Sequence, residues 1–394
     1  MKKLPISSIT VRDAHPDTPL THVAPVYLSS TYIYESAEHA SKVFEGKEEA
    51  FIYSRWSHPN AVLVEEKLAA LEGYDLPKPA QALAFSSGMA AISALMQTLL
   101  QAGDTVLMQG NVYGTTVDYI RHTEQQLKLK VIFFDPADLE VTQRLLQQER
   151  PRLMYVESPA NPTLSVYDLT ALAKLAKRTG AVSVIDSTFA SPLLQRPLKH
   201  GFDLVVHSST KYLNGHGNSL SGMVVGRNEA LMQRIWTTRK LHGSIIAPFD
   251  AWLLNNGLKT FHLRMPRHCA NAMQVAQWLQ KHTSVAVVHY PGLPSHPHHG
   301  LAKKQMHDFG GVLSFELKDG IRAGKKLMNR VKWCQLTASL GTADTLIQHP
   351  ASMSHSFVPR AQRLKYGIAD GLVRLAVGIE DAQLIIDDLR EALK

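Results

Sequence analysis

The sequence has few cysteines and no long apolar run. Its 394 residues include only Cys269 and Cys334, which excludes a disulfide framework and is typical of a reducing cytoplasm. No apolar run approaches the roughly 18 residues of a membrane-spanning helix. The first residues are basic but are not followed by the apolar stretch of a secretory signal. We therefore expect a cytoplasmic protein that does not contact a membrane.

The sequence also lacks any block of like charge. The net charge of +8 comes from 42 Lys and Arg against 34 Asp and Glu, and the basic residues are scattered along the chain. Nucleic-acid binding is therefore not expected, whereas an anionic cofactor and carboxylate substrates would be attracted by the excess. A Gly-x-Gly-x-x-Gly turn is absent as well, which argues against a nicotinamide-dependent oxidoreductase.

Four histidines lie close together in a loop rich in proline and glycine. They are His296, His298, His299 and His307. Acidic or cysteine partners at metal-ligand spacing do not accompany them, so we expect solvated histidines and no metal site.

The length and composition predict a globular protein with more than one core. Hydrophobic residues make up 45% of the chain and charged residues 19%. We divide the chain into an arm (1–60), a large cofactor-binding domain (61–258) and a C-terminal domain (259–394). Prolines 5, 16, 19 and 25 and several tyrosines interrupt any regular pattern in the arm, so we predict that it is irregular and packs on a neighbouring subunit.

Short apolar strands alternate with amphipathic helices through the large domain, which predicts a mainly parallel sheet covered on both faces. The expected strands are 82–85, 105–108, 130–134, 153–156, 182–185 and 204–206, with a return strand at 222–225. The expected helices are 61–72, 86–100, 115–126, 139–148 and 169–178. A long helical stretch at about 248–281 would lead to the smaller α/β domain, with strands at 286–290, 312–317 and 371–378 and helices at 319–331 and 381–393.

Two of the predicted strands end in residues with complementary chemistry. Lys211 follows the strand 204–206 after three hydroxyl residues, and Asp186 follows the strand 182–185. Ligands of open α/β sheets bind outside the carboxyl ends of the strands, so the acid and the amine face one crevice. Pyridoxal phosphate needs this pair, because a lysine forms its Schiff base and an aspartate keeps its pyridine nitrogen protonated.

A phosphate cradle is predicted at the same edge. The strand 82–85 is followed by Ser86-Ser87-Gly88, which opens a helix, and the free N–H groups there favour an anion. Alone, this turn is typical of an ordinary helix start. Glu157, Asn161 and the segment 111–114 follow other strand ends, so one site should collect all of them.

At this point the motifs are similar to a known family. The chain resembles the Cys/Met-metabolism group of pyridoxal-phosphate enzymes, which includes cystathionine lyases and synthases, methionine γ-lyases and O-acylhomoserine sulfhydrylases. The matching motifs run through nearly the whole chain: Tyr53-Ser54-Arg55, 86–91, Tyr113-Gly114, 157–162, Asp186-Ser187-Thr188, 208–211, Ser339-Leu340-Gly341 and 373–375. The resemblance implies the fold-type-I, transferase-like α/β fold and a homotetramer built as a dimer of active dimers.

The resemblance also implies a role for each matching residue. Lys211 would carry the cofactor and then move protons, Asp186 would pair with the pyridinium, and Tyr113 would stack on the ring and protonate the leaving sulfur. Further cofactor contacts would come from Ser87, Gly88, Met89, Thr188, Ser208 and Thr210, and from Tyr53 and Arg55 of a neighbouring subunit. Substrate contacts would come from Arg374, Asn161, Ser339, Glu157 and Leu340.

The sequence departs from the family at positions that bear on the substrate. Thr115 stands where methionine γ-lyases usually have cysteine, and Arg239-Lys240 replaces their usual Lys-Asp pair. Ala338 stands where cystathionine γ-lyases and synthases often have glutamate, and Leu340 where β-lyases tend to have tryptophan. In the arm, His58-Pro59-Asn60 replaces the usual Asn-Pro-Thr.

The segment 349–356 looks most like methionine γ-lyases. We therefore expect a carbon–sulfur γ-lyase that converts methionine or homocysteine to a thiol, 2-oxobutanoate and ammonia. The alternative is γ-replacement, as in an O-acetyl- or O-succinylhomoserine sulfhydrylase or a cystathionine γ-synthase.

Overall fold

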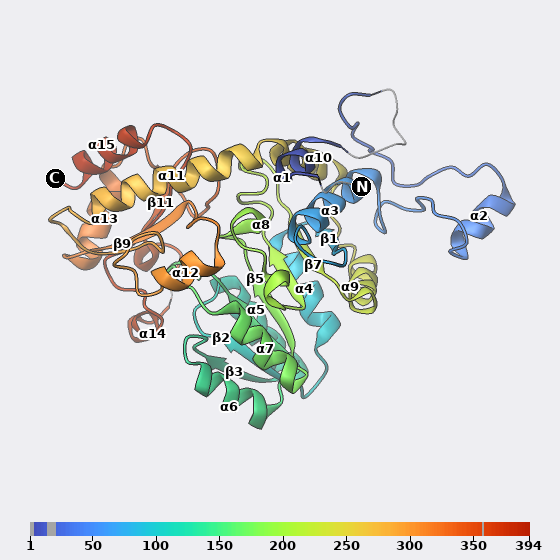
Figure 1. Cartoon of the computed structure of the whole chain (residues 1–394), viewed down its shortest axis with the longest axis horizontal. Coiled ribbons are helices and arrows are strands. Elements are labelled where there is room, and N and C mark those ends of the chain that lie inside the picture. The colour runs from blue at the N-terminus through green and yellow to red at the C-terminus, as the bar shows by residue number, and fades with distance from the viewer. Residues whose placement is uncertain (1–3, 14–20, 357) are drawn as a thin grey trace.

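The computed structural model describes residues 4–13, 21–356 and 358–394. Two sheets, each with its own helices, form the body, and an N-terminal segment extends away from it (Figure 1). Pro16 and Pro19 of the predicted arm lie outside the described residues. None of the helices described is long and apolar enough to cross a bilayer.

The larger sheet has seven strands in the order β1-β7-β6-β5-β4-β2-β3. The four pairings from β6 to β3 are parallel, and β7 runs antiparallel to both of its neighbours, which confirms the predicted mainly parallel sheet with a return strand. The strands are β1 (Gln81–Phe85), β2 (Thr105–Gln109), β3 (Lys130–Phe134), β4 (Leu153–Glu157), β5 (Val182–Asp186), β6 (Leu204–His207) and β7 (Gly222–Gly226).

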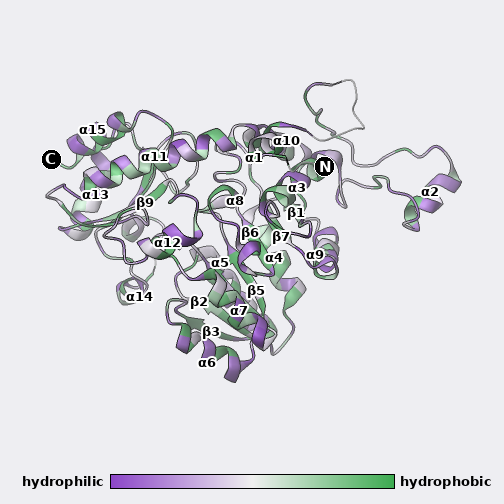
Figure 2. Cartoon of the chain, viewed as in Figure 1, coloured by the Kyte–Doolittle hydropathy of each residue, from purple (hydrophilic) through white to green (hydrophobic). Residues whose placement is uncertain are grey.

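Helices cover both faces of this sheet, as expected for buried apolar strands (Figure 2). They are α3 (Pro59–Glu72), α4 (Gly88–Leu99), α5 (Gly114–Leu127), α6 (Leu139–Glu149), α7 (Leu169–Thr179), α8 (Ser191–Leu194), α9 (Glu229–His242) and α10 (Pro248–Lys259), with a 3-10 turn at Pro197–His200. Ser87, Asp138 and Asp168 fix three of the helix starts, because each side chain accepts a hydrogen bond from a backbone N–H of the first turn.

The C-terminal half forms the predicted smaller α/β unit around a five-stranded sheet of order β10-β11-β12-β9-β8. Its strands are β8 (Val285–His289), β9 (Val312–Leu317), β10 (Gln335–Leu336), β11 (Leu346–Gln348) and β12 (Leu372–Ala376). Its helices are α11 (Phe261–Leu279), α12 (His299–Gln305), α13 (Gly320–Arg330), α14 (Arg360–Lys365) and α15 (Ala382–Ala392), with a 3-10 turn at Pro350–Ser352. The exact domain boundaries at residues 60 and 258 stay predictions.

The structure divides one predicted helical stretch and overturns another expectation about helices. The stretch predicted at 248–281 consists of two helices that meet at Thr260, where the Gly257 carbonyl accepts from the Arg264 guanidinium at 2.8 Å. The segment predicted to be irregular contains α1 (Ile6–Val11) and α2 (Ala37–Phe44). Ser36 caps α2 by accepting from His39 N, a helix-start signal that the aromatic composition of the segment concealed.

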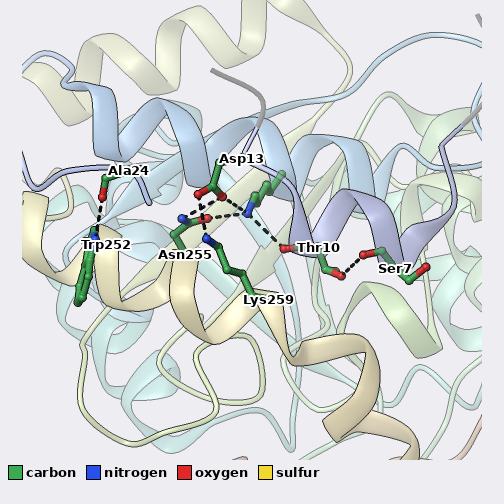
Figure 3. A network of polar contacts seen from close by, with 8 residues as sticks. Ser7, Thr10, Asp13, Ala24, Trp252, Asn255 and Lys259 are labelled. Carbon is green, nitrogen blue, oxygen red and sulfur yellow. Dashed lines mark hydrogen bonds and ion pairs between the residues drawn. The ribbon is translucent and has the colours of Figure 1, made fainter. Parts of the chain in front are cut away.

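A polar network anchors α1 to the body (Figure 3). The buried Lys67 ammonium donates to Asp13 at 2.8 Å and to Asn255 at 2.7 Å, and Lys259 reaches the other Asp13 oxygen at 2.9 Å. Burial opposes the charge of Asp13, but the two lysines hold the pKa of its carboxyl below the ordinary value. Lys67 also donates to the Thr10 carbonyl of α1 at 3.2 Å, so the network ties this first part of the predicted arm to α3 and α10.

Asp13→Ala should lower the free energy of unfolding by about 1–3 kcal/mol, because the Lys67 ammonium would stay buried without its carboxylate. The measurement is the urea midpoint at pH 7 and fixed protein concentration. Asp319→Ala is the control, because Asp319 lies in an exposed ion pair that should contribute little. Equal midpoints for the two variants would contradict a stabilising role for the network.

Candidate active site

The carboxyl ends of the parallel strands surround a cavity of about 250 Å³. Glu157 and Asp186 are register partners at the ends of β4 and β5, and Lys211 lies in the connection from β6 to β7. The predicted site residues that line the cavity are Ser87, Gly88, Met89, Tyr113, Glu157, Asn161, Asp186, Thr188, Ser208, Thr210, Lys211, Leu340 and Arg374. Topology thus brings together residues that lie up to 287 positions apart, from Ser87 to Arg374.

Three predicted site residues are placed differently. Ser339 joins the site through a hydrogen bond, since its Oγ accepts from the Lys211 Nζ at 2.9 Å. Tyr53 and Arg55 do not line the cavity of their own chain. Arg55 instead donates from Nη1 to the carbonyl of Lys240 at 2.6 Å. Their predicted role requires a second copy of the chain.

The surroundings of Lys211 favour the neutral form of its amine. Burial and the nearby Arg374 guanidinium lower its pKa to about 8. At pH 7 roughly a tenth of the amine is therefore unprotonated, far more than for an ordinary lysine, and carries the lone pair that attacks an aldehyde.

Asp186 is a buried carboxylate that a neighbouring cation would stabilise. Its Oδ1 accepts from the backbone N–H of Thr188 at 2.9 Å. Burial nevertheless raises the pKa of the carboxyl, because a charged oxygen is poorly solvated at this depth. A protonated ring nitrogen beside Asp186 would offset that cost.

Glu157 uses both carboxylate oxygens to hold its neighbours. Oε2 accepts from the Tyr113 N–H at 2.8 Å, and Oε1 accepts from the Asn161 N–H at 2.7 Å. Burial and the adjacent Asp186 raise its pKa to about 8. This geometry favours a positioning role, and the predicted direct contact of Glu157 with substrate stays a prediction.

The predicted phosphate cradle forms where two turns meet. Ser87 caps the 12-residue helix α4, so the helix N-terminus opens on the cavity. A Cβ on Gly88 would lie 2.9 Å from the Ser208 Cβ, so only glycine lets the two turns approach this closely. The backbone N–H groups and the dipole of α4 favour an anion at this place.

Arg374 lies on the opposite wall, buried on β12. Its Nη1 donates to the Asn161 Oδ1 at 3.1 Å and its Nη2 to the Ser339 carbonyl at 2.8 Å. The Gln348 amide, oriented with its oxygen toward Arg374, accepts at 3.2 Å from Nε. In the described part of the chain these hydrogen-bond partners are neutral, so a substrate carboxylate would supply the missing negative charge.

Two residues that hold the Lys211 turn escaped the sequence analysis. Arg264 of α11 donates to the Tyr212 carbonyl at 2.9 Å, and nothing in a helical sequence pattern signals this contact. Gly341 has φ +77°, and a Cβ there would lie 2.6 Å from the Tyr212 N. The glycine of the Ser-Leu-Gly motif was a sequence signal for this contact, because only glycine readily permits both the positive φ and the close approach.

The four histidines of the loop are not all solvated as expected, because His296 is buried and its Nδ1 accepts from the His298 N–H at 3.2 Å. His298 accepts from the Val166 N–H at 3.1 Å, His299 packs on Phe309, and His307 lies 2.9 Å from Arg196. Within residues 4–13, 21–356 and 358–394, no group of three or more His, Cys, Asp or Glu side chains is arranged to hold a metal ion.

A half-buried amine, a buried carboxylate and an anion cradle in one cavity are the groups that pyridoxal phosphate requires, and together they define the site of a pyridoxal-phosphate-dependent enzyme. Residues 8–394 match the family described as Cys/Met metabolism PLP-dependent enzyme. The chain belongs to this family.

Individual relatives agree with this assignment. The chain is 44% identical to the L-methionine gamma-lyase of Fusobacterium nucleatum subsp. nucleatum over 95% of this chain and 94% of that protein. It is 41% identical to the cystathionine beta-lyase of Coxiella burnetii over 100% of this chain and 98% of that protein. The solved cystathionine gamma synthase of Xanthomonas oryzae pv. oryzae in complex with cystathionine has a TM-score of 0.91, with 35% identity over 99% of this chain and 98% of that one.

The apoprotein should react with pyridoxal phosphate at a rate that rises with pH, reaches half of its maximum near pH 8 and then levels off. The neutral Lys211 amine is the reactive form, and its lowered pKa fixes the midpoint. Stopped-flow absorbance of the lysine-bound cofactor measures the rate, and Arg374→Met should shift the midpoint upward. A wild-type rate that still climbs beyond pH 10 would contradict the lowered pKa.

Proposed function

We propose that the protein is a cytoplasmic carbon–sulfur γ-lyase that acts on methionine or homocysteine. With methionine the reaction consumes one water and yields methanethiol, 2-oxobutanoate and ammonia. The observation that carries the proposal is the pairing of Lys211 with Arg374 across one small cavity, because the amine and the carboxylate clamp of an amino-acid site are then both present. The similarity to methionine γ-lyases supports the same assignment.

Three apolar residues that line the cavity favour a short apolar substrate end. Ala338, Leu340 and Leu220 contribute apolar surface there. A second charged group, such as the distal amino group of cystathionine, finds no carboxylate on these three residues and would be costly to bury. A methylthio group fits this chemistry. Thr115 is exposed on α5 and does not line the cavity, so its replacement of cysteine leaves the described wall unchanged.

Asp186, Lys211 and the α4 cradle would hold pyridoxal phosphate, and Gly88, Met89, Ser208 and Thr210 line the phosphate end. When bound, the cofactor holds the substrate amine and accepts the electron pair released at Cα. Lys211, once free, takes the proton from the substrate Cα and then moves a proton at Cβ, which prepares the Cγ–S bond for cleavage.

Tyr113 would protonate the leaving group, and Arg374 would orient the substrate. Tyr113 stands half-exposed at the mouth, where its hydroxyl can give a proton to the leaving sulfur. Glu157 fixes the backbone of Tyr113 and of Asn161 at once, so the proton donor and the carboxylate pocket keep one relative position. Arg374 orients the substrate so that the Cα proton lies near Lys211.

The alternative function is γ-replacement on an O-acylhomoserine. The likeness to a cystathionine gamma synthase structure and the exposed Leu220 at the cavity favour it, since a thiol must enter while the substrate is bound. The two reactions share their early proton transfers, so the residues above serve both.

We also propose that the active unit is a dimer and that two dimers form a homotetramer. The N-terminal segment extends from the body and exposes Leu28, Ile33 and Phe44, which a second chain would cover (Figure 1). Tyr53 and Arg55 would then reach the cofactor phosphate of the neighbouring subunit. Sedimentation of the holoprotein as a single chain would contradict this assembly.

A paired turnover assay tests the function. One sample contains L-methionine alone and the other an O-acylhomoserine with sulfide, and both are followed for 2-oxobutanoate and homocysteine. We expect fast 2-oxobutanoate from methionine. Lys211→Ala is the control and should lose nearly all turnover in both samples. Homocysteine from the second sample, with methionine inert, would assign the protein to γ-replacement instead.

A further inference from the structure

The short segment Tyr53 to Trp56 is held against the C-terminal end of α9. Arg55 donates to the Lys240 carbonyl at 2.6 Å, and the buried Arg239 donates from Nη2 to the Trp56 carbonyl at 3.4 Å. Gly243, which follows the last residue of α9, has φ +70°, and a Cβ there would lie 3.3 Å from the Arg55 Cδ. The C-terminal end of α9 therefore packs closely against this segment and binds it by hydrogen bonds.

The Lys240 ammonium lies between two indole rings. Its Nζ is 3.4 Å from the centroid of the Trp56 ring and 5.2 Å from that of Trp236. Trp236 belongs to α9, one turn before Lys240, whereas Trp56 belongs to the segment next to Arg55. A cation on the faces of two partly buried indoles joins the helix to the segment more strongly than one exposed contact would.

The contacts hold the Arg55 side chain by one nitrogen of its guanidinium. Trp56 is half-buried, while Arg55 and Tyr53 are exposed, and the Arg55 guanidinium lies 5.3 Å from the Tyr53 ring centroid. Nη1 of Arg55 donates to the Lys240 carbonyl, and the side chain is otherwise exposed. Holding a long side chain in advance lowers the entropy that is lost when it binds an anion.

We propose that Lys240, clamped between Trp56 and Trp236, is a positioning residue that prepares Arg55 to bind the cofactor phosphate of a neighbouring subunit. The inference rests on the proposed assembly and on the proposed role of Arg55. It assigns a task to Lys240 of the Arg239-Lys240 pair, whose ammonium binds the arm and does not face the cavity of its own chain.

The test is the dissociation constant of pyridoxal phosphate for the apoprotein, read from the absorbance of the lysine-bound cofactor. Lys240→Met removes the cation and keeps the chain length, and it should raise the constant about fivefold to tenfold. Lys240→Arg restores a cation that stacks on indole and should stay within about twofold of the wild type. Lys303→Met, at an exposed position on α12, is the matched control and should leave the constant unchanged.

A double-mutant cycle separates positioning from general stability. If Lys240 acts through Arg55, then Lys240→Met should add nothing in an Arg55→Ala background. Trp56→Leu, which keeps an apolar side chain, should reproduce the effect of Lys240→Met, and thermal unfolding of each variant reports whether the fold is intact.

Each outcome decides a different point. A wild type that forms no lysine-bound cofactor overturns the proposed function and this inference together. A wild type that binds normally while Lys240→Met and Trp56→Leu bind equally well overturns the inference alone. The same holds if the effects of Lys240→Met and Arg55→Ala add in full, because Lys240 would then act independently of Arg55.

Discussion

The structure depends on the packing of the two sheets around the Lys211 turn. Gly341 approaches the backbone after Lys211 so closely that a methyl group would collide with it, and Arg264 binds the carbonyls on the other side. This contact brings Ser339 to the Lys211 amine and places β12 with Arg374 above the strand ends. The contact therefore joins Lys211, which follows β6 of the larger sheet, and Arg374 of the smaller sheet in one site.

The electrostatics of the cavity follow from burial. Two carboxylates end neighbouring strands in register, so each is desolvated and the pKa of each is raised. Two cations, Lys211 and Arg374, face them with lowered pKa values for the same reason. Such a site favours a ligand that brings both signs of charge, which a pyridinium, a phosphate and an amino-acid carboxylate together supply.

Much of the fold and the site could be predicted from the sequence. Apolar strands followed by Glu157, Asp186 and the Lys211 motif are local patterns, and the topology of parallel sheets then forces their ends together. Contacts between distant segments left no such pattern, as for Arg264, which looks like any polar helix residue. The break at Thr260 was missed for the same reason, since the Arg264 guanidinium that binds the freed carbonyl is visible only in the fold.

Side-chain roles were harder to predict than positions. Glu157 lies where it was expected, yet its oxygens are occupied by two backbone N–H groups, a detail set by the turns after β2 and β4. Tyr53 and Arg55 do not line the cavity of their own chain, so their proposed role requires another copy of the chain. Local sequence therefore defines which groups are presented, and packing determines what each of them touches.

The most direct measurement is borohydride reduction of the holoprotein followed by peptide mass spectrometry. Reduction fixes the cofactor to the amine that holds it, so the label reports the attachment site without relying on activity. The account predicts a phosphopyridoxyl group on Lys211 and on no other lysine. A label on a different lysine, or none in protein saturated with pyridoxal phosphate, would contradict it.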